Sequence, residues 1–501
     1  MPSTLFAKSS GCKKYKHLRR VAAWRNAATL RIINGVVGTL LYAMVSKINM
    51  TSGPLVRPMI AFALPLIASG ILQQSFNAVD IVVAGRFAGP HALAAVGSNG
   101  PVIGLMINMF LGLAVGVNVV IANYIGQRNS RGTSAATGAS MLLSLVCGVL
   151  MVTITQLCAD PMLRLLDTPA EVLDDAIEYL RIFALGMPSM IIYNFGAAVL
   201  RSIGDTRRPF YSLVAAGIAN VGFNFLFVAG MGMGVQGVAW GTVLSNVINA
   251  AIIVVILLRE RSDVRLVPSK MRFKVSEIAK VCRIGLPAGL QTTVFSISNI
   301  FILSAINSFG ASASAGSAAA LTYEIYCYFV MTAFTQTATA FVGQNYGAGN
   351  IERIRRIFRL SLVMCVVASA ILNIGLAWAR ELFMLPFTDD AEVLAFGCER
   401  MLVVLTWQFI ASYYELAGAT MRGIGYSMTP ALITIFGTCV LRLFWVGFFP
   451  ADGTFGQLLL IYPVSWALTD AMMFVAMRMI MPRLRASAAL EPADMPQPQV
   501  G

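Results

Sequence analysis

Charged residues are scarce in this chain, and histidine is almost absent. Lys, Arg, Asp and Glu make up 12% of the 501 residues, which is about half the fraction found in a soluble domain. Hydrophobic residues make up 57%, and the mean hydropathy is +0.74. A chain this long and this apolar would aggregate in water, so its solvent must be lipid. The composition therefore predicts an integral membrane protein.

Residues needed for several kinds of chemistry are also missing. His17 and His91 are far apart, and the eight cysteines include no CxxC pair. This pattern excludes the usual metal sites and disulfide frameworks, so we expect no metal and no cofactor. There is no HExxH motif and no GxSxG motif with triad partners, so we expect no enzyme activity and no catalytic residue. The net charge of +14 is spread over short loops, which argues against nucleic acid as a partner.

What the sequence does contain is an internal repeat. Four short segments recur in the same order, at separations of 217 to 222 residues. They are Leu64-Pro65 with Leu286-Pro287, Gly126-Gln127 with Gly343-Gln344, Ala170–Leu173 with Ala391–Leu394, and Arg201–Gly204 with Arg422–Gly425. Related halves of a membrane protein usually face each other across a pathway, so transport is the leading functional hypothesis.

Apolar segments long enough to span a bilayer form two sets of six. They lie near 57–85, 92–124, 134–157, 176–200, 209–230 and 236–258, and near 281–306, 314–342, 357–379, 395–420, 429–449 and 457–482. An even number of spans per half makes the two repeats parallel. We predict an all-α integral membrane protein of twelve transmembrane helices in two six-helix lobes. The lobes cover 53–258 and 281–485, and the linker 259–280 joins them.

Basic residues indicate the orientation. They gather in the linker and in the loops that contain Arg201 and follow Gly343-Gln344, all on one side. By the positive-inside rule this side is cytoplasmic, and both termini lie there too. The acidic segments 160–178 and 381–399 fall on the opposite side, where we expect short amphipathic stretches at the membrane surface.

The two ends of the chain differ from the rest. Residues 1–52 are basic and contain no acid, and their one apolar run, Ile32–Val45, is too short to span. Three interpretations are open: a basic surface-binding tail, a targeting segment, or upstream sequence that is not normally translated. We favour the third, because Met50 stands just before the first span. The proline-rich segment 486–501 is predicted to be disordered.

Asp80 lies deep in the first span, where a charge costs about 2.5–3.5 kcal/mol on insertion scales. Desolvation favours its neutral form, so Asp80 is a candidate for proton exchange. Gln73 lies two helical turns earlier on the same face. The predicted ion-coupling cluster also draws on the fifth and sixth spans and comprises Asp80, Gln73, Asn77, Asn220, Asn224 and Thr242. The alternative is that these groups only hold helices together by hydrogen bonds.

The second half carries Glu324, Glu415, Arg442 and Asp470 inside its spans. An unpaired charge at this depth is costly, so we expect Arg442 to form a structural pair with an acid and assign Asp470 as that acid. Glu324 stands beside Tyr323 and further aromatic residues, which suits a cavity wall with one acid for a cationic guest. The alternative is that the aromatic residues only pack. The predicted substrate cavity comprises Tyr193, Tyr323, Glu324 and Glu415.

Two prolines stand at matching places in the first and seventh spans. Pro65 and Pro287 each remove a helical hydrogen bond and allow bending. We interpret them as hinges, with a static kink as the alternative.

The sequence resembles the MATE family (multidrug and toxic compound extrusion transporters), in its bacterial DinF-like branch. The resemblance covers about residues 54–485. It rests on Leu64-Pro65, Gly126-Gln127, Arg201–Thr206, Gly232–Gly237 and Gly343–Gly349.

This resemblance implies a V-shaped pair of lobes in the bacterial inner membrane. It implies export of amphipathic, often cationic, small molecules by alternating access, driven by inward flow of H⁺ or Na⁺. It also implies a coupling site in the first lobe, where Pro65, Gln73, Asp80, Asn220 and Thr242 match the family's residues.

Departures from the family pattern bear on the coupling ion. Asn224 stands where the family has an aspartate, which leaves Asp80 as the only acid of the site and favours H⁺ over Na⁺. The second-lobe acids of sodium-coupled NorM-like members have no counterpart, because Phe295 and Ala411 stand near their places.

A flippase for lipid-linked saccharides, from the same superfamily, is the alternative function. Such flippases often have fourteen spans and a strongly cationic cavity, whereas this chain has twelve predicted spans and little positive charge at membrane depth beyond Arg442. A channel is disfavoured, because duplicated and kinked halves fit alternating access better. We expect a monomer whose partners are small-molecule substrates and the lipid bilayer.

Overall fold

The computed structural model describes residues 48–166, 168–450 and 452–488, with the backbone alone over 485–488. The predicted extension over 1–52 therefore lies outside the described residues up to position 47. The predicted tail over 486–501 lies outside them from position 489.

The described residues that precede α2 (Val56–Val83) are held by the second half of the chain. The Asn345 side-chain amide donates a hydrogen bond to the carbonyl of Met50 at 3.0 Å. Arg353 donates to the carbonyls of Met50, Ser52 and Gly53 at 3.0 to 3.2 Å. Met50, Ser52 and Gly53 are thus bound by the second half, and the first two of them belong to the segment 1–52 that the sequence analysis set apart as an extension.

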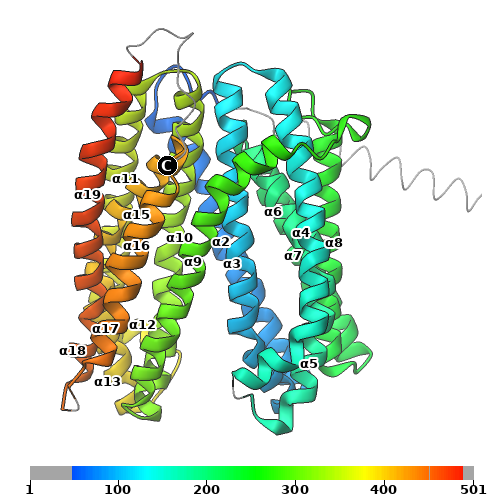
Figure 1. The fold of residues 1–501 in the computed structure, drawn as a ribbon. Helices are drawn as coiled ribbons and strands as arrows, with labels where there is room; N and C mark the ends of the chain where they lie inside the picture. Colours follow the sequence, from blue (N-terminus) through cyan, green and yellow to red (C-terminus); the bar gives the residue numbers. More distant parts are fainter. Residues whose placement is uncertain (1–47, 167, 451, 489–501) are drawn as a thin grey trace, which may run out of the picture. The chain divides into compact units, whose positions relative to one another are not determined.

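Six spans make up the first half (Figure 1). Its helices are α2 (Val56–Val83), α3 (Pro90–Gly126), α4 (Ser130–Leu165), α5 (Ala170–Leu185), α6 (Met187–Ser202), α7 (Arg207–Asn224) and α8 (Gly234–Arg259). Two of them continue as π-helical turns, α2 over Ala84–Ala88 and α7 over Phe225–Gly230. Helices α5 and α6 form one bent span, with an angle of 44°. Pro188 in the first turn of α6 has no backbone N–H to donate, which favours this bend.

The second half repeats this plan with more interruptions. Its helices are α9 (Val275–Asn307), α10 (Ala311–Gly347), α11 (Ile351–Trp378), α12 (Arg380–Met384), α13 (Ala391–Arg400), α14 (Thr406–Gln408), α15 (Ser412–Gly423), α16 (Met428–Thr434), α17 (Leu441–Gly447), α18 (Phe455–Leu459) and α19 (Ile461–Ala488). A short 3₁₀ turn, Pro268–Lys270, lies in the linker between the halves. Helices α13 to α15 are consecutive parts of one span, and so are α16 and α17. Over the described residues, eleven segments are long and apolar enough to cross a membrane, and the bent α5–α6 pair makes twelve. The predicted all-α fold with twelve spans is confirmed.

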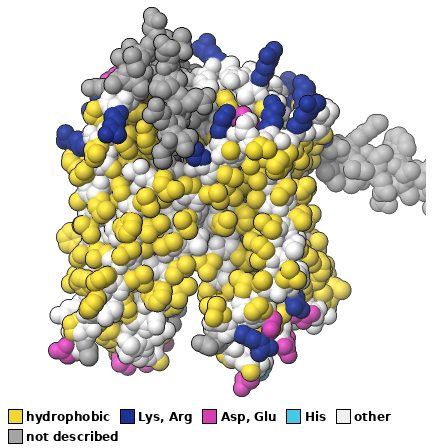
Figure 2. Space-filling view, viewed as in Figure 1, with side chains coloured by type: hydrophobic (Ala, Val, Ile, Leu, Met, Phe, Trp, Pro, Cys, Tyr) yellow, Lys and Arg dark blue, Asp and Glu magenta, His cyan; other side chains and the backbone are white. Residues whose placement is uncertain are grey.

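The outer surface is suited to lipid. On the face seen in Figure 2, hydrophobic side chains cover both halves, Lys and Arg gather mainly at one end, and most of the visible Asp and Glu lie at the other. Trp378, Phe448 and Leu157 are each exposed over at least 75% of their surface. An apolar belt of this extent would be unstable in water but matches a bilayer core.

Glycines bring the two halves into close contact along α3. Gly112 of α3 lies against the backbone of Gly289 in α9, and Gly116 lies against Gly285 one turn away. Further toward the basic end, the backbone of Gly126 meets Gln344 in α10, so the repeated Gly-Gln segments touch each other. A side chain at any of these glycines would collide with backbone atoms. At the acidic end a hollow separates the halves (Figure 2), in agreement with the expected V-shaped arrangement.

Candidate coupling site and substrate cavity

Asp80 and Asn224 stand where two helices change their winding. Asp80 lies one turn before α2 becomes π-helical at Ala84, and Asn224 is the last residue of α7 before its π-helical turn. Such turns widen the helix and redirect side chains, and they are frequent at functional sites. Here they lie beside two of the six residues predicted to form the coupling cluster.

The structure brings four of the six predicted cluster residues together. The side-chain amide of Asn224 donates to Oδ1 of Asp80 and, at 3.4 Å, to Oδ1 of Asn220. The hydroxyl of Thr242 in α8 lies 3.4 Å from the second oxygen of Asp80 and can donate its hydrogen there or to the carbonyl of Val238 at 3.1 Å. Three helices, α2, α7 and α8, are thereby joined through one carboxylate.

The other two predicted members lie apart from these bonds. Gln73 and Asn77 have exposed side chains, and among the described residues neither has a hydrogen bond to Asp80. Both lie on the same helix as Asp80, as predicted, but the side chains that bind Asp80, Asn224 and Thr242, come from other helices.

Asn224 occupies space that is available because residue 241 is a glycine. A Cβ atom at Gly241 would collide with Oδ1 of Asn224, so α7 and α8 approach closely at this level. Asn224 is fully buried, and its Oδ1 has no hydrogen-bond partner among the described residues. A buried acceptor without a partner is costly. The Oδ1 atom of Asn224 is therefore an available acceptor for a hydrogen bond from Asp80 when that carboxyl group is protonated.

A buried ion pair in the second half involves a residue that the sequence analysis passed over. Arg400, the last residue of α13, donates to both oxygens of Glu324 in α10, at 2.6 and 3.0 Å. Arg400 is 3% and Glu324 6% exposed. The hypothesis of a free acid for a cationic guest needs correction, because a guanidinium already binds Glu324. Arg400 lies within the predicted span 395–420. A charge at membrane depth needs a partner, so the sequence did contain a signal for this ion pair.

An aromatic cavity of about 350 Å³ lies beside this ion pair. Helices α9 and α10 form one side of it, and Arg400, Gln408 and Arg442 contribute polar groups. Its aromatic lining comes from Phe295, Tyr328, Tyr414, Tyr462 and Trp466. Phe295 and Ala411, noted in the sequence for their lack of charge, both line it.

The predicted pair of Arg442 and Asp470 is wrong. Nη1 of Arg442 donates to Oδ1 of Asn299 at 2.8 Å, and Nε donates to the hydroxyl of Ser465 at 3.3 Å. Asp470 instead accepts the backbone N–H of Tyr414 at 2.8 Å. Asp470 therefore binds a backbone N–H that an interrupted helix leaves free. The partners of Arg442 are neutral side chains.

The remaining predicted cavity residues do not line this cavity. The hydroxyl of Tyr323 donates to the carbonyl of Phe383 at 2.7 Å, so this residue packs between helices. Glu415 accepts from the hydroxyl of Tyr328 at 3.3 Å. Tyr193 belongs to α6 in the first half and donates to the carbonyl of Pro209 at 3.4 Å.

Comparison with known proteins identifies the family. The family model described as MatE matches residues 65–226 and 287–445, one stretch in each half. The chain belongs to the MATE family.

Individual relatives of this MATE protein are distant but cover most of its length. The probable multidrug resistance protein YoeA of Bacillus subtilis is 26% identical over 388 residues, which cover 76% of this chain and 84% of YoeA. The probable multidrug resistance protein NorM of Thermotoga maritima is 25% identical over 395 residues, with 77% and 84% covered. A solved structure of a multidrug resistance MATE family transporter in its outward-facing conformation superposes with a TM-score of 0.81 at 22% identity, and the match covers 88% of this chain and 99% of that one.

MATE family members are transporters and not enzymes, as predicted for this chain.

The two predicted hinges lie inside long helices, Pro65 in α2 and Pro287 in α9. The hydroxyl of Ser69 donates to the carbonyl of Pro65 at 2.7 Å. Pro65 and Asp80 belong to the same helix.

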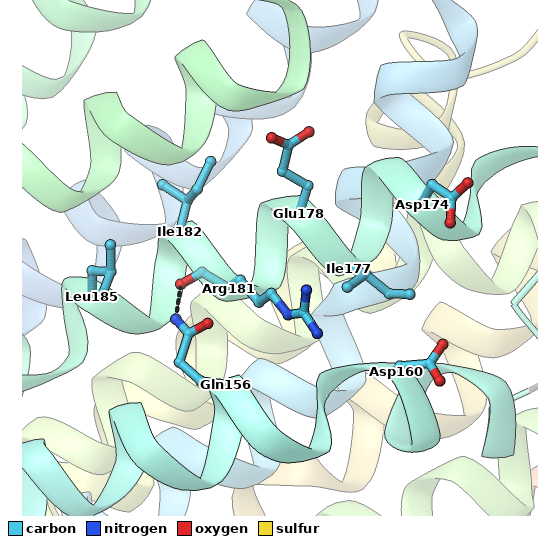
Figure 3. Close-up of a pocket in the computed structure, with 8 residues that line it drawn as sticks. All are labelled: Gln156, Asp160, Asp174, Ile177, Glu178, Arg181, Ile182 and Leu185. Atoms are coloured by element: carbon cyan, nitrogen blue, oxygen red, sulfur yellow. Dashed lines mark hydrogen bonds between the residues drawn. The ribbon is translucent and has the colours of Figure 1, made fainter.

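A second hollow of this MATE protein opens on the surface at its acidic end. It is lined by α4 and α5 through Gln156, Asp160, Asp174, Ile177, Glu178, Arg181, Ile182 and Leu185 (Figure 3). Gln156 donates to the carbonyl of Arg181 at 2.9 Å, which fixes α5 on α4. The hollow shares no residue with the Asp80 cluster or the aromatic cavity, and most of its charged residues are exposed.

Proposed function

We propose that this protein exports amphipathic organic compounds from a bacterial cell across the inner membrane, in exchange for protons. In this proposal the basic end of the molecule faces the cytoplasm, together with both termini. The multidrug resistance names of YoeA and NorM support the substrate class. The positive-inside rule supports the orientation, because the linker between the halves is rich in Lys and Arg.

The observation that carries the proposal is a single carboxylate bound by one amide and one hydroxyl from two other helices. Ionised Asp80 accepts hydrogen bonds from Asn224 and Thr242. Protonated Asp80 has a hydrogen to donate, and the unpartnered Oδ1 of Asn224 can accept it after a rotation of the amide. The two protonation states therefore have different hydrogen bonds between α2 and α7. This difference can favour two helix arrangements.

Charge favours the proton over sodium. Among the described residues, no second carboxylate contacts Asp80, and the other members of the cluster are neutral. Protonation removes the buried charge altogether. A bound sodium ion would leave an ion pair that needs several further oxygen ligands in an apolar lobe.

The contact between the halves supports alternating access. They meet through α3, α9 and α10 at the basic end and are separated at the acidic end. In our orientation this arrangement opens to the outside. Proton uptake at Asp80 would alter α2, and Pro65 would let this helix bend.

Vesicles with imposed gradients test the proposal. Purified protein is reconstituted, and dye accumulation is followed with a pH gradient or a sodium gradient alone, at a clamped membrane potential. We expect uphill transport with the pH gradient, abolished by a protonophore. Transport driven by sodium at equal pH would refute proton coupling. No transport with either gradient would refute coupled export.

A further inference from the structure

We propose that the aromatic cavity of the second half binds the carboxylate of a small aromatic anion through Arg442. This inference rests on the proposed function of substrate export and names a substrate class for it. It opposes the cationic guest that the sequence suggested for this cavity.

The first argument is the charge within the cavity. Its lining contains two cations, Arg400 and Arg442, and one acid, Glu324. Arg400 binds both oxygens of Glu324, so these two charges cancel. Arg442 keeps its positive charge without a carboxylate partner among the described residues. The cavity therefore carries one excess positive charge and disfavours a cation.

The second argument is the unused donor on Arg442. This side chain is 1% exposed, and its Nη2 has no hydrogen-bond partner among the described residues. Asn299 and Ser465 occupy the other two nitrogens. A guanidinium buried in an apolar lobe favours an oxyanion as its partner, because charge-assisted hydrogen bonds are stronger than neutral ones.

The third argument is the shape and lining of the site. The guanidinium carbon of Arg442 lies 5.0 Å from the ring centre of Phe295 and 4.8 Å from that of Tyr462. Together with Trp466 these rings form apolar walls, and a volume of about 350 Å³ suits a small organic molecule. An aromatic monoanion fits this combination of charge, rings and size.

The site also lies where a transported molecule could reach it. Helices α9 and α10 line the cavity and also contact the first half. Leu303 and Tyr328 on these helices line the cavity and remain 49% and 39% exposed. The cavity therefore reaches the surface of the second half along helices that also pack against the first half.

A matched pair of probes tests this proposal. 2-Naphthoate and 2-naphthylmethylammonium have similar aromatic bodies and opposite charges. Their binding to the purified full chain in lipid nanodiscs is measured by titration calorimetry. We expect naphthoate to bind at least about tenfold more tightly than the cation.

Variants identify the group responsible. Arg442→Gln should weaken naphthoate binding by about tenfold or more, and Arg442→Lys should retain most of it. Phe295→Glu places a carboxylate beside Arg442 and should also remove anion binding, so the proposal can be tested even if Arg442→Gln does not fold. Arg478→Gln is the matched control, because this exposed arginine of α19 stacks on Phe474 and is not part of the cavity lining.

The outcomes separate this inference from the proposed function. Tighter binding of the cation, or unchanged naphthoate binding in folded Arg442→Gln and Phe295→Glu, would overturn the anion site. Binding is measured without a gradient, so naphthoate binding that depends on Arg442 would support the site even if vesicles showed no coupled transport. Proton-driven export of cations without naphthoate binding would leave the proposed function intact and refute the inference.

Discussion

Asn224 donates an amide hydrogen to Asp80 from a position 144 residues further along the chain. This bond ties α2 to α7 at the level where both helices become π-helical. Because the amide carries both a donor and an acceptor, it can serve the ionised and the protonated carboxyl group in turn. The pair therefore has the property that a proton-coupled switch requires.

Replacing Asp80 with asparagine should abolish coupled export. Asp80→Asn keeps the size of the side chain and the capacity to accept from Thr242, but it cannot exchange a proton. We expect the variant to insert, to melt near the wild-type temperature, and to accumulate dye only at the level of protein-free vesicles under a pH gradient. Asp160→Asn on α4, which removes an exposed acid paired with Arg164, is the control and should transport normally. Normal proton-driven export by Asp80→Asn would exclude Asp80 as the coupling acid.

The position of Asp80 in a spanning helix could be predicted, because a lone acid in an apolar run is visible in the sequence. Its partners could be predicted in part. Asn220, Asn224 and Thr242 lie in apolar segments with helical spacing. Gln73 shares a helix face with Asp80 but does not reach it. The rotation of a helix about its axis, which decides such contacts, depends on packing against neighbours and not on its own sequence.

The charge pairs of the second half were harder to predict for the same reason. Four ionisable residues were recognised within the spans, but their pairing depends on which faces meet. Glu324 binds Arg400, 76 residues away, and Asp470 is taken by a backbone N–H that an interrupted helix leaves free. Helix interruptions of this kind, here a π-helical and a 3₁₀ turn between Met401 and Ala411, have no clear sequence signal.

The ion pair of Glu324 and Arg400 should stabilise the second half. Removing either partner leaves a buried charge without compensation, so Glu324→Gln and Arg400→Gln should each cost about 3–5 kcal/mol of unfolding free energy. The double variant should be less destabilised than the sum of the two. The measurement is a double-mutant cycle from reversible unfolding in mixed micelles. Additive losses would mean that the two side chains do not depend on each other.

The glycine contact between the halves should tolerate no side chain. At Gly112 a Cβ would collide with the backbone of Gly289, so Gly112→Ala should cost about 1–3 kcal/mol through overpacking and should slow export. Gly104 is the matched control on the same helix, because a Cβ there meets nothing within 4 Å. Gly104→Ala should melt at or above the wild-type temperature, since alanine favours the helix by about 1 kcal/mol. Equal effects of the two substitutions on melting and transport would argue against a tight seam.

A second carboxylate should change the coupling ion. Asn224→Asp places an acid beside Asp80 while Asn220 and Thr242 remain as neutral oxygen ligands. Two close carboxylates repel each other when both are ionised, and a sodium ion between them relieves this repulsion. The hard oxygen ligands and the extra negative charge then compensate for the dehydration of the ion. We expect a sodium gradient at equal pH to drive export in vesicles that contain Asn224→Asp and to have no effect on the wild type.

Asn224→Ser, which adds a small neutral oxygen, is the control and should show no response to sodium. If Asn224→Asp gains no sodium-driven transport while it still folds and exports under a pH gradient, the number of carboxylates does not select the ion, and the argument from charge is wrong.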